Sequence, residues 1–267
     1  MLDLEFAELS HQGRVRGNNE DCLGHVLPTG PAQVQSQGWF FAIADGMGGH
    51  ECGEVASQLA IHTALDGFRK MPKGVMHVSL LPRLVQEANA AVYDAGRATR
   101  ERAGKAMGAT IVACALRFDS AVVSHVGDSR CYLFRNGNGT QLTRDHTVAE
   151  EQVRLGILSK AEAASNEGRH LLTRSLGSEL FVAADTLTVN LLPGDILLLC
   201  TDGLYGSVPD TVLLQTILQN SRLEQAAQAL VQAANDAGGP DNISVQLIRV
   251  KSVERMGLYR GRPYRLL

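Results

Sequence analysis

The sequence predicts an α+β fold, and three of its patterns support that class. Helix-like segments fall into two pairs, over about 51–102 and about 207–236. Blocks of strand-like segments separate and flank these pairs, so the regular strand–helix alternation of a parallel sheet is not expected. The most apolar strand-like segments are continuous runs, which is typical of strands covered on both faces. The 267 residues contain no internal repeat, low-complexity tract or linker.

The first part of the chain combines short strands with two long helices. Segments 3–10 and 21–27 have strand patterns, and the apolar run at 39–44 predicts a buried strand. Apolar residues at helical spacings then predict a helix from Glu51 to Arg69. A second helix is expected from about Pro82 to Arg102. Both helices are expected to pack on a sheet.

The middle of the chain predicts three strands and then a less regular region. The strands are expected at about 109–118, 121–126 and 130–134, and Asn136-Gly137 is a hairpin-turn signal. Segment 145–180 is interpreted as short helices near 148–158 and 159–164, with a loop at 166–168.

The last part of the chain repeats the pattern of a buried strand followed by helices. A second continuous apolar run at 196–199 predicts another buried strand. Ser207 is expected to cap a helix that has Pro209 near its first turn. A longer helix is expected from Leu223 to Asp236, before a strand at 243–248.

Charge and apolar content argue against several classes of protein. The formal net charge is -3, so no basic face for nucleic acid is expected. The start, Met1–Glu5, carries acids and no apolar core, unlike a signal peptide. Every apolar run is far shorter than the roughly 20 residues that span a bilayer. Five cysteines without a close pair do not predict a disulfide framework. A cytoplasmic protein without membrane or nucleic-acid partners is therefore expected.

Acidic residues recur at the boundaries of the predicted strands. The five positions are Asp21, Asp45, Asp128, Asp202 and Asp241. Taken alone, Asp45-Gly46 is also compatible with an ordinary turn. Gathered at one sheet edge, however, the carboxylates would raise one another's pKa, and a divalent cation is the usual way to keep such a cluster ionised. No histidine or cysteine pair has metal-ligand spacing, so oxygen ligands and a hard ion, Mg²⁺ or Mn²⁺, are expected.

These acids belong to an ordered set of motifs. In chain order the motifs are Arg16 with Asn19-Glu20-Asp21, Asp45-Gly46-Met47-Gly48-Gly49-His50, Gly127-Asp128-Ser129-Arg130, Thr201-Asp202-Gly203 and Gly239-Pro240-Asp241-Asn242. Each motif alone is weak evidence. Together, in this order and spacing, they resemble the bacterial branch of the type 2C metal-dependent Ser/Thr protein phosphatases, the PPM family. The resemblance covers nearly the whole chain, from residue 16 to residue 242.

The resemblance implies a four-layer αββα sandwich, with two antiparallel β-sheets packed face to face and flanked by helix pairs. It implies a single catalytic domain over 1–250, with a mobile flap at about 145–180 beside the active site. That flap is expected to tune the choice of protein substrate, although a plain surface excursion is the alternative. Residues 251–267 form a basic tail interleaved with aromatics, and such a chain end is expected to be poorly ordered.

The resemblance also implies roles for individual residues. Asp45 would bridge two central metal ions, and Asp202 and Asp241 would bind one of them. The remaining ligands, partly through water, would be Glu20, Asp21 and the backbone carbonyl of Gly46. Asp128 would hold a third, weaker ion. Arg16 would bind phosphate oxygens, because its planar guanidinium suits bidentate contact.

The implied chemistry is direct hydrolysis without a phosphoenzyme. Paired metal ions lower the pKa of water and clamp phosphoryl oxygens. A general acid could protonate the leaving serine or threonine oxygen. Met47 stands where animal-type members carry a histidine, so His50 is a candidate acid or substrate contact, with a structural role at the helix start as the alternative. Arg130 is left outside the site, because it could equally be a structural ion-pair partner.

The predicted function is hydrolysis of phosphoserine and phosphothreonine on proteins, opposing a bacterial Ser/Thr kinase. One alternative is a catalytically silent module that binds phosphoproteins, which the presence of all the expected acids disfavours. Another is a small-molecule phosphatase, with which the same fold is compatible. The expected partners are phosphorylated proteins and a cognate kinase, the expected cofactor is Mn²⁺ or Mg²⁺, and the expected state is a monomer.

Overall fold

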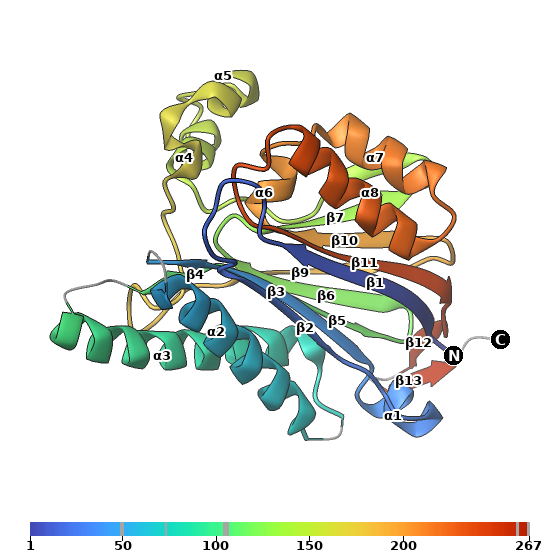
Figure 1. Ribbon diagram of the computed structural model, residues 1–267. Coiled ribbons are helices and arrows are strands. Elements are labelled where there is room, and N and C mark those ends of the chain that lie inside the picture. The colour runs from blue at the N-terminus through green and yellow to red at the C-terminus, as the bar shows by residue number, and fades with distance from the viewer. Residues whose placement is uncertain (49–50, 73, 104–106, 260–261, 266–267) are drawn as a thin grey trace.

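The computed structural model describes residues 1–48, 51–72, 74–103, 107–259 and 262–265. Two antiparallel β-sheets stack face to face, and helices cover both outer faces (Figure 1). The predicted α+β class and the four-layer αββα arrangement are confirmed. None of the described helices is long and apolar enough to cross a membrane.

One sheet has six strands and is covered by the two long helices of the first half. Its strand order is β2 (Asp21–Val26), β3 (Trp39–Met47), β5 (Ile111–Arg117), β6 (Ser120–Val126) and β9 (Asp185–Asn190), with β4 (Gly108–Ala109) paired to the end of β3. Helices α2 (Glu51–Arg69) and α3 (His77–Ala103) lie side by side on its outer face (Figure 1).

The other sheet has five strands and carries the helices of the second half. Its order is β1 (Asp3–His11), β11 (Ile243–Ser252), β10 (Ile196–Cys200), β7 (Arg130–Arg135) and β8 (Asn138–Gln141). Helices α7 (Asp210–Gln219) and α8 (Leu223–Asp236) cover its outer face, and the short α6 (Asp202–Tyr205) follows β10 directly. Segments far apart in the chain meet in this sheet, because the first strand, β1, pairs with β11.

Continuous apolar runs form the central strands because both of their faces are buried. On β3, Phe40 and Ala42 pack against α2 and α3, while Phe41 and Ile43 pack against the second sheet. This alternation follows from the two-residue period of a strand. The cysteines at 114, 131 and 200 are free and fully buried in these layers, as expected for small apolar side chains.

The segment 145–180, called the flap segment here, leaves the four layers and returns to them. It contains α4 (Val148–Arg154), α5 (Lys160–Ser165) and the 3₁₀ helix η1 (Glu167–His170). In Figure 1, α4 and α5 stand apart from the sheets. Two legs join the flap segment to the body at 145–148 and 171–174, and they pair with each other through Thr147 and Leu172.

Several boundaries differ from the sequence prediction because tertiary contacts decide them. Helix α3 begins at His77 and contains Pro82, since Leu80 and Leu81 bury its first turns. Ser207 does not cap α7, because its N–H bonds to Leu204 in the turn that ends α6; Pro209 occupies that cap instead.

Elements that were not predicted include α1 (Pro31–Ser36), β9, and the two strands of a C-terminal hairpin, β12 (Met256–Tyr259) and β13 (Arg262–Arg265). The hairpin lies within the tail for which a poorly ordered end was expected. Local sequence did not indicate it, because it depends on pairing between the two strands.

Candidate metal centre

The predicted acids gather around one cleft of ≈ 840 Å³. Asp45, Asp128, Asp202 and Asp241 line it, together with Arg16, Glu20 and Gly46. Asp21 lies directly beside the cleft as the cross-strand partner of Asp45 in the β2–β3 pair. Segments from both sheets therefore bring together every predicted site residue that the structure describes. His50 lies outside the described residues.

Asp45 occupies the end of β3, which continues past the apolar run to Met47. Its N–H donates to Thr110 Oγ1 at 2.9 Å, and its carbonyl accepts the N–H of Thr110 at 2.8 Å. The strand end packs closely on α2, because a Cβ on Gly46 would lie 1.9 Å from the carbonyl oxygen of Gly53. Burial, with the nearby charges of Asp21 and Asp202, raises the pKa of Asp45 well above its ordinary value.

Asp21 is a buried carboxyl that is only half satisfied. Its Oδ2 accepts the hydroxyl of Thr201 at 2.8 Å, whereas Oδ1 has no hydrogen-bond partner among the described residues. Burial raises the pKa of Asp21 to about 7, against hydrogen bonds from Ser244 and Thr201 that favour the ionised form. A buried carboxylate oxygen without a donor is costly unless a cation meets it.

Asp202 and Asp241 come from the second sheet. Asp202 begins α6 directly after β10, and burial with the charges of Asp128 and Asp241 raises its pKa well above the ordinary value. Asp241 precedes β11, and its Oδ2 accepts Arg16 Nη2 at 2.7 Å. This hydrogen bond raises the pKa of Arg16. The arginine predicted to contact phosphate therefore stands at the edge of the acid cluster.

Asp128 follows β6 and is 6% exposed. Burial and the charge of Asp145 raise its pKa to about 6. The preceding Gly127 has φ of +100°, and a Cβ there would lie 2.6 Å from a methyl carbon of Thr110. Only glycine fits this turn without strain. Tyr205 donates its hydroxyl to the Asp128 carbonyl at 3.0 Å, which holds the turn from the other sheet.

This donor set fits hard divalent cations. The acids supply carboxylate oxygens, Gly46 supplies a nearby backbone carbonyl, and the orphaned Oδ1 of Asp21 lacks a donor. A cation would stabilise the ionised forms of acids whose pKa values are raised. Oxygen ligands of this kind suit Mg²⁺ and Mn²⁺.

Asn242 supports the site, and the sequence analysis did not single it out. It is 4% exposed, and its Oδ1 accepts the N–H of Glu20 at 2.8 Å. Its Nδ2 donates to the carbonyls of Gln12 and Asn18 at 2.8 and 2.9 Å. Asn242, which directly follows Asp241, thus connects the Asp241 segment to the loop that carries Arg16. The available signal was its place in the motif Gly239-Pro240-Asp241-Asn242, directly after a predicted acid.

Two residues of η1 also face the cleft and were not predicted. Arg169 and His170 line it from the flap segment, and Arg169 Nε donates to His170 Nε2 at 2.7 Å. Burial and the charge of Arg169 lower the pKa of His170. The family resemblance placed the flap segment beside the active site, but no signal within the segment indicated that these two residues face the acids.

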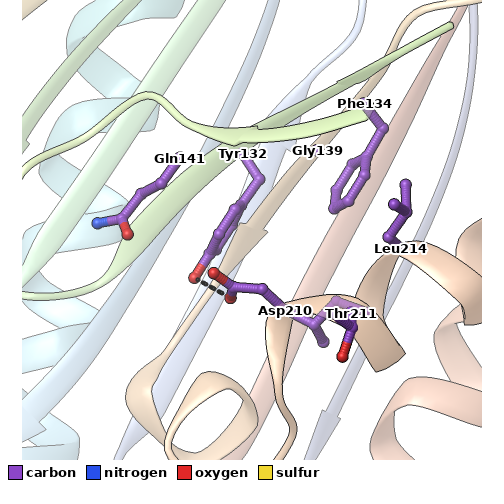
Figure 2. A pocket seen from close by; sticks show the side chains of 8 residues that line it. Tyr132, Phe134, Gly139, Gln141, Asp210, Thr211 and Leu214 are labelled. Carbon is purple, nitrogen blue, oxygen red and sulfur yellow. Dashed lines mark hydrogen bonds between the residues drawn. The ribbon is translucent and has the colours of Figure 1, made fainter. Parts of the chain in front are cut away.

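Arg130 is a structural ion-pair partner. Its Nε and Nη2 contact the Asp145 carboxylate at 3.0 and 2.7 Å, and its guanidinium stacks over the Tyr205 ring at 3.6 Å from the centroid. Its Nη1 donates to Tyr132 Oη, and the Tyr132 hydroxyl donates to Asp210 Oδ1 at 3.3 Å. Tyr132 and Asp210 line a smaller cavity of ≈ 160 Å³ (Figure 2). That small cavity lacks the cluster of acids that marks the larger cleft.

The fold and the acid-lined cleft define a class of protein, and comparison with known proteins agrees with it. The family model for protein phosphatase 2C matches residues 8–243. The chain belongs to the protein phosphatase 2C family, whose members are metal-dependent phosphatases.

Individual relatives match over nearly their full length. A serine/threonine phosphatase stp of Listeria welshimeri is 35% identical over 254 residues, covering 94% of this chain and 96% of that protein. The crystal structure of the Mycobacterium tuberculosis serine/threonine phosphatase PstP/Ppp superposes with a TM-score of 0.83 at 33% identity, covering 94% of this chain and 100% of that one. A PstP catalytic domain in complex with two manganese ions superposes with a TM-score of 0.79 at 33% identity, with the same coverage.

Proposed function

We propose that this protein hydrolyses phosphoserine and phosphothreonine on other proteins with a metal-activated water. The observation that carries the proposal is the convergence of Asp45, Asp202 and Asp241 on a cleft that also holds Arg16. The relatives named above are serine/threonine phosphatases, which supports the substrate class. Solvent-exposed residues such as His170 line the cleft, so a phosphorylated side chain can enter it from the surface.

We assign the metal ligands as the sequence analysis expected them. Asp45 would bridge two ions, Asp202 and Asp241 would bind one of them, and Glu20, Asp21 and the Gly46 carbonyl would complete the shell. Bound ions lower the pKa of water and neutralise charge on the phosphoryl group. The hydrogen bond from Thr201 holds Oδ2 of Asp21, and Oδ1 has no hydrogen-bond partner in the described part of the chain.

Arg16 is proposed to bind the phosphate. In the structure it pairs with Asp241, and its side chain is 55% exposed. A cation beside Asp241 would compete for that carboxylate, and the guanidinium would then be available to donate hydrogen bonds to two phosphate oxygens. Asn242 keeps the Arg16 loop in place through the Gln12 and Asn18 carbonyls.

We also propose that Mn²⁺ or Mg²⁺ fills the central pair, and that Asp128 holds a third, weaker ion. The PstP structure with two manganese ions supports a two-metal centre. Asp128 comes from the turn after β6 and lines the same cleft as Asp45, which supports a separate ligand position beside the central pair. His50 remains the proposed general acid or substrate contact.

The remaining proposals concern context. We propose a single catalytic domain over 1–250 with the flap at about 145–180, followed by a basic tail over 251–267. We further propose that the protein acts as a monomer in the cytoplasm and opposes a cognate Ser/Thr kinase.

The testing experiment measures hydrolysis of p-nitrophenyl phosphate with and without Mn²⁺, beside Asp45→Asn. We expect metal-dependent turnover that falls by more than about 100-fold in the variant, because changes outside the ligands already cost about 10–100-fold. Activity on phosphopeptides compared with phosphorylated metabolites tests the substrate class. Folded protein without turnover under either metal would refute catalysis and favour a silent phosphoprotein-binding module.

A further inference from the structure

A buried polar cluster lies behind Asp128 and outside the cleft lining. It consists of His125 on β6, His146 and Arg174 on the two legs of the flap segment, and Asp185 on β9. His125 is 1% exposed and His146 is fully buried. Their rings stack with centroids 4.7 Å apart. Buried polar side chains such as these two imidazoles are costly unless they are hydrogen-bonded.

His146 makes three bonds that join separate segments. Its Nδ1 accepts the N–H of Gly127 at 3.1 Å, and its own N–H donates to the Gly127 carbonyl at 3.0 Å. Its carbonyl accepts the N–H of Thr173 at 2.8 Å. One residue on the first leg therefore holds both the residue before Asp128 and the second leg of the flap segment.

The side chain extends this connection through its other nitrogen. Because Nδ1 accepts a hydrogen bond, the proton of the neutral ring is assigned to Nε2, which lies 3.4 Å from Asp185 Oδ2 and 3.3 Å from Arg174 Nη1. Burial lowers the pKa of His146 to about 4, so the ring is neutral near pH 7. Asp185 Oδ1 accepts Arg174 Nη1 at 2.8 Å, which anchors the second leg to the same carboxylate.

The spacing of this cluster resembles a metal site, but its charges do not. Ligand atoms of His125, His146 and Asp185 lie within 4.8 Å of one another. However, Arg174 and Arg144 both approach Asp185, Arg144 at 3.8 Å. A divalent cation would lie beside two guanidinium groups with one carboxylate to balance them. His125 Nε2 donates to the Arg144 carbonyl at 2.9 Å, and its Nδ1 has no hydrogen-bond partner among the residues that the structure describes, so it is the two guanidinium groups that disfavour a cation.

We propose that His146 is a positioning residue that connects the flap segment to the turn carrying Asp128. Through Gly127 it sets the direction of the Asp128 carboxyl toward the cleft. Through Thr173, Arg174 and Asp185 it fixes the second leg, which leads to the cleft residue Leu172. When the flap segment moves, the turn that carries Asp128 then moves with it. Only the ion at Asp128 rests on the proposed function; the connection itself rests on the bonds described.

Two variants separate the two ends of the imidazole. In His146→Asn, the amide oxygen replaces Nδ1 and can still accept the Gly127 N–H, while the arm toward Asp185 is lost. In His146→Gln, the amide reaches toward Asp185, while the Gly127 N–H loses its acceptor. His62→Gln, on the exposed face of α2, is the matched control.

The experiment measures hydrogen exchange over 126–130 and 171–175 and the binding of Mn²⁺ from the electron paramagnetic resonance signal of the free ion. In His146→Gln we expect faster exchange in both segments and about tenfold weaker binding of the weakest Mn²⁺, equivalent to 1.4 kcal/mol. In His146→Asn, exchange over 126–130 and Mn²⁺ binding stay close to those of the unmodified protein and of the control. Melting temperatures of all three variants report general destabilisation separately.

Two results would overturn the proposal. One is equal exchange over 126–130 in the Asn and Gln variants. The other is faster exchange over 171–175 in His146→Gln with no change over 126–130. An unmodified protein that lacks phosphatase activity or a third Mn²⁺ would contradict the proposed function instead, and the exchange data would still decide the role of His146.

Discussion

Once metal ions are removed by a chelator, the free energy of unfolding of this protein should fall as the pH rises. Burial raises the pKa of Asp21 from 3.8 to about 7, and each unit is worth 1.36 kcal/mol, so ionising this carboxyl in the metal-free fold costs about 4 kcal/mol. The folded protein holds this proton at pH values where the unfolded chain has lost it. The contribution of Asp21 to the free energy of unfolding is therefore greatest below about pH 4 and declines until about pH 7.

The same direction applies to the other acids of the cluster. The pKa values of Asp45, Asp128 and Asp202 are also raised, by burial first and by neighbouring carboxylates next. Because these groups share one cleft, their protons leave in steps that belong to the cluster as a whole. Bound Mn²⁺ displaces the protons, so the decline should disappear when the metal is present.

Urea unfolding followed by circular dichroism measures this effect at pH 5 and pH 8, with EDTA or with Mn²⁺. In Asp21→Asn the carboxyl cannot ionise, and the loss of stability between pH 5 and pH 8 should shrink by about 3 kcal/mol, because only the two units from pH 5 to about 7 fall within this range. Asp66→Asn is the control, because Asp66 is a surface partner of Arg69 with 58% side-chain exposure. A metal-free protein whose stability is constant or rises from pH 5 to pH 8 would refute the reasoning, as would an Asp21→Asn variant with an unchanged slope.

Four further predictions concern the cleft and its rim. Asn242→Ala should lower the free energy of unfolding by about 1–3 kcal/mol and raise the Mn²⁺ concentration needed for activity, because the Glu20 N–H loses its acceptor; denaturation and metal titration measure both. Arg16→Lys should raise KM for a phosphopeptide by about tenfold at unchanged metal content, since lysine lacks the bidentate fork; equal KM values would exclude a phosphate contact. Replacing 155–170 should alter rates on phosphoproteins and spare those on a small aryl phosphate, whereas equal effects on both would count against a role in substrate choice. His50→Ala should slow esters with poor leaving groups more than good ones, and a uniform small effect would remove His50 from the mechanism.

The predicted acids could be found from sequence because their signal is local. Asp45 and Asp202 each follow a continuous apolar run, and such a run indicates a buried strand whatever its neighbours are. Ordered motifs then indicated which acids belong together. The alternation of Phe40 and Phe41 between two cores likewise follows from the strand period alone.

The supporting residues could not be found this way, because their partners are distant in the chain. Asn242 bonds to Gln12 and Asn18 across more than 220 residues, and Thr201 bonds to Asp21 across 180. Asn242 and Thr201 both stand in the ordered motifs beside a predicted acid, but nothing local in the sequence indicates which distant groups they bond to. The start of α3 at His77, ahead of Pro82, depends in the same way on burial of Leu80 and Leu81.

The sequence by itself predicted the class of fold, the acids that line the cleft and the family, since apolar periodicity is local and the order of the motifs can be read along the chain. Tertiary structure alone decided the half-satisfied Asp21, the pairing of Arg16 with Asp241, and the attachment of the flap segment to Gly127 through His146. Hydrogen bonds and pKa values depend on which groups are brought within a few ångströms and shielded from water. That proximity is created only when the two sheets pack together.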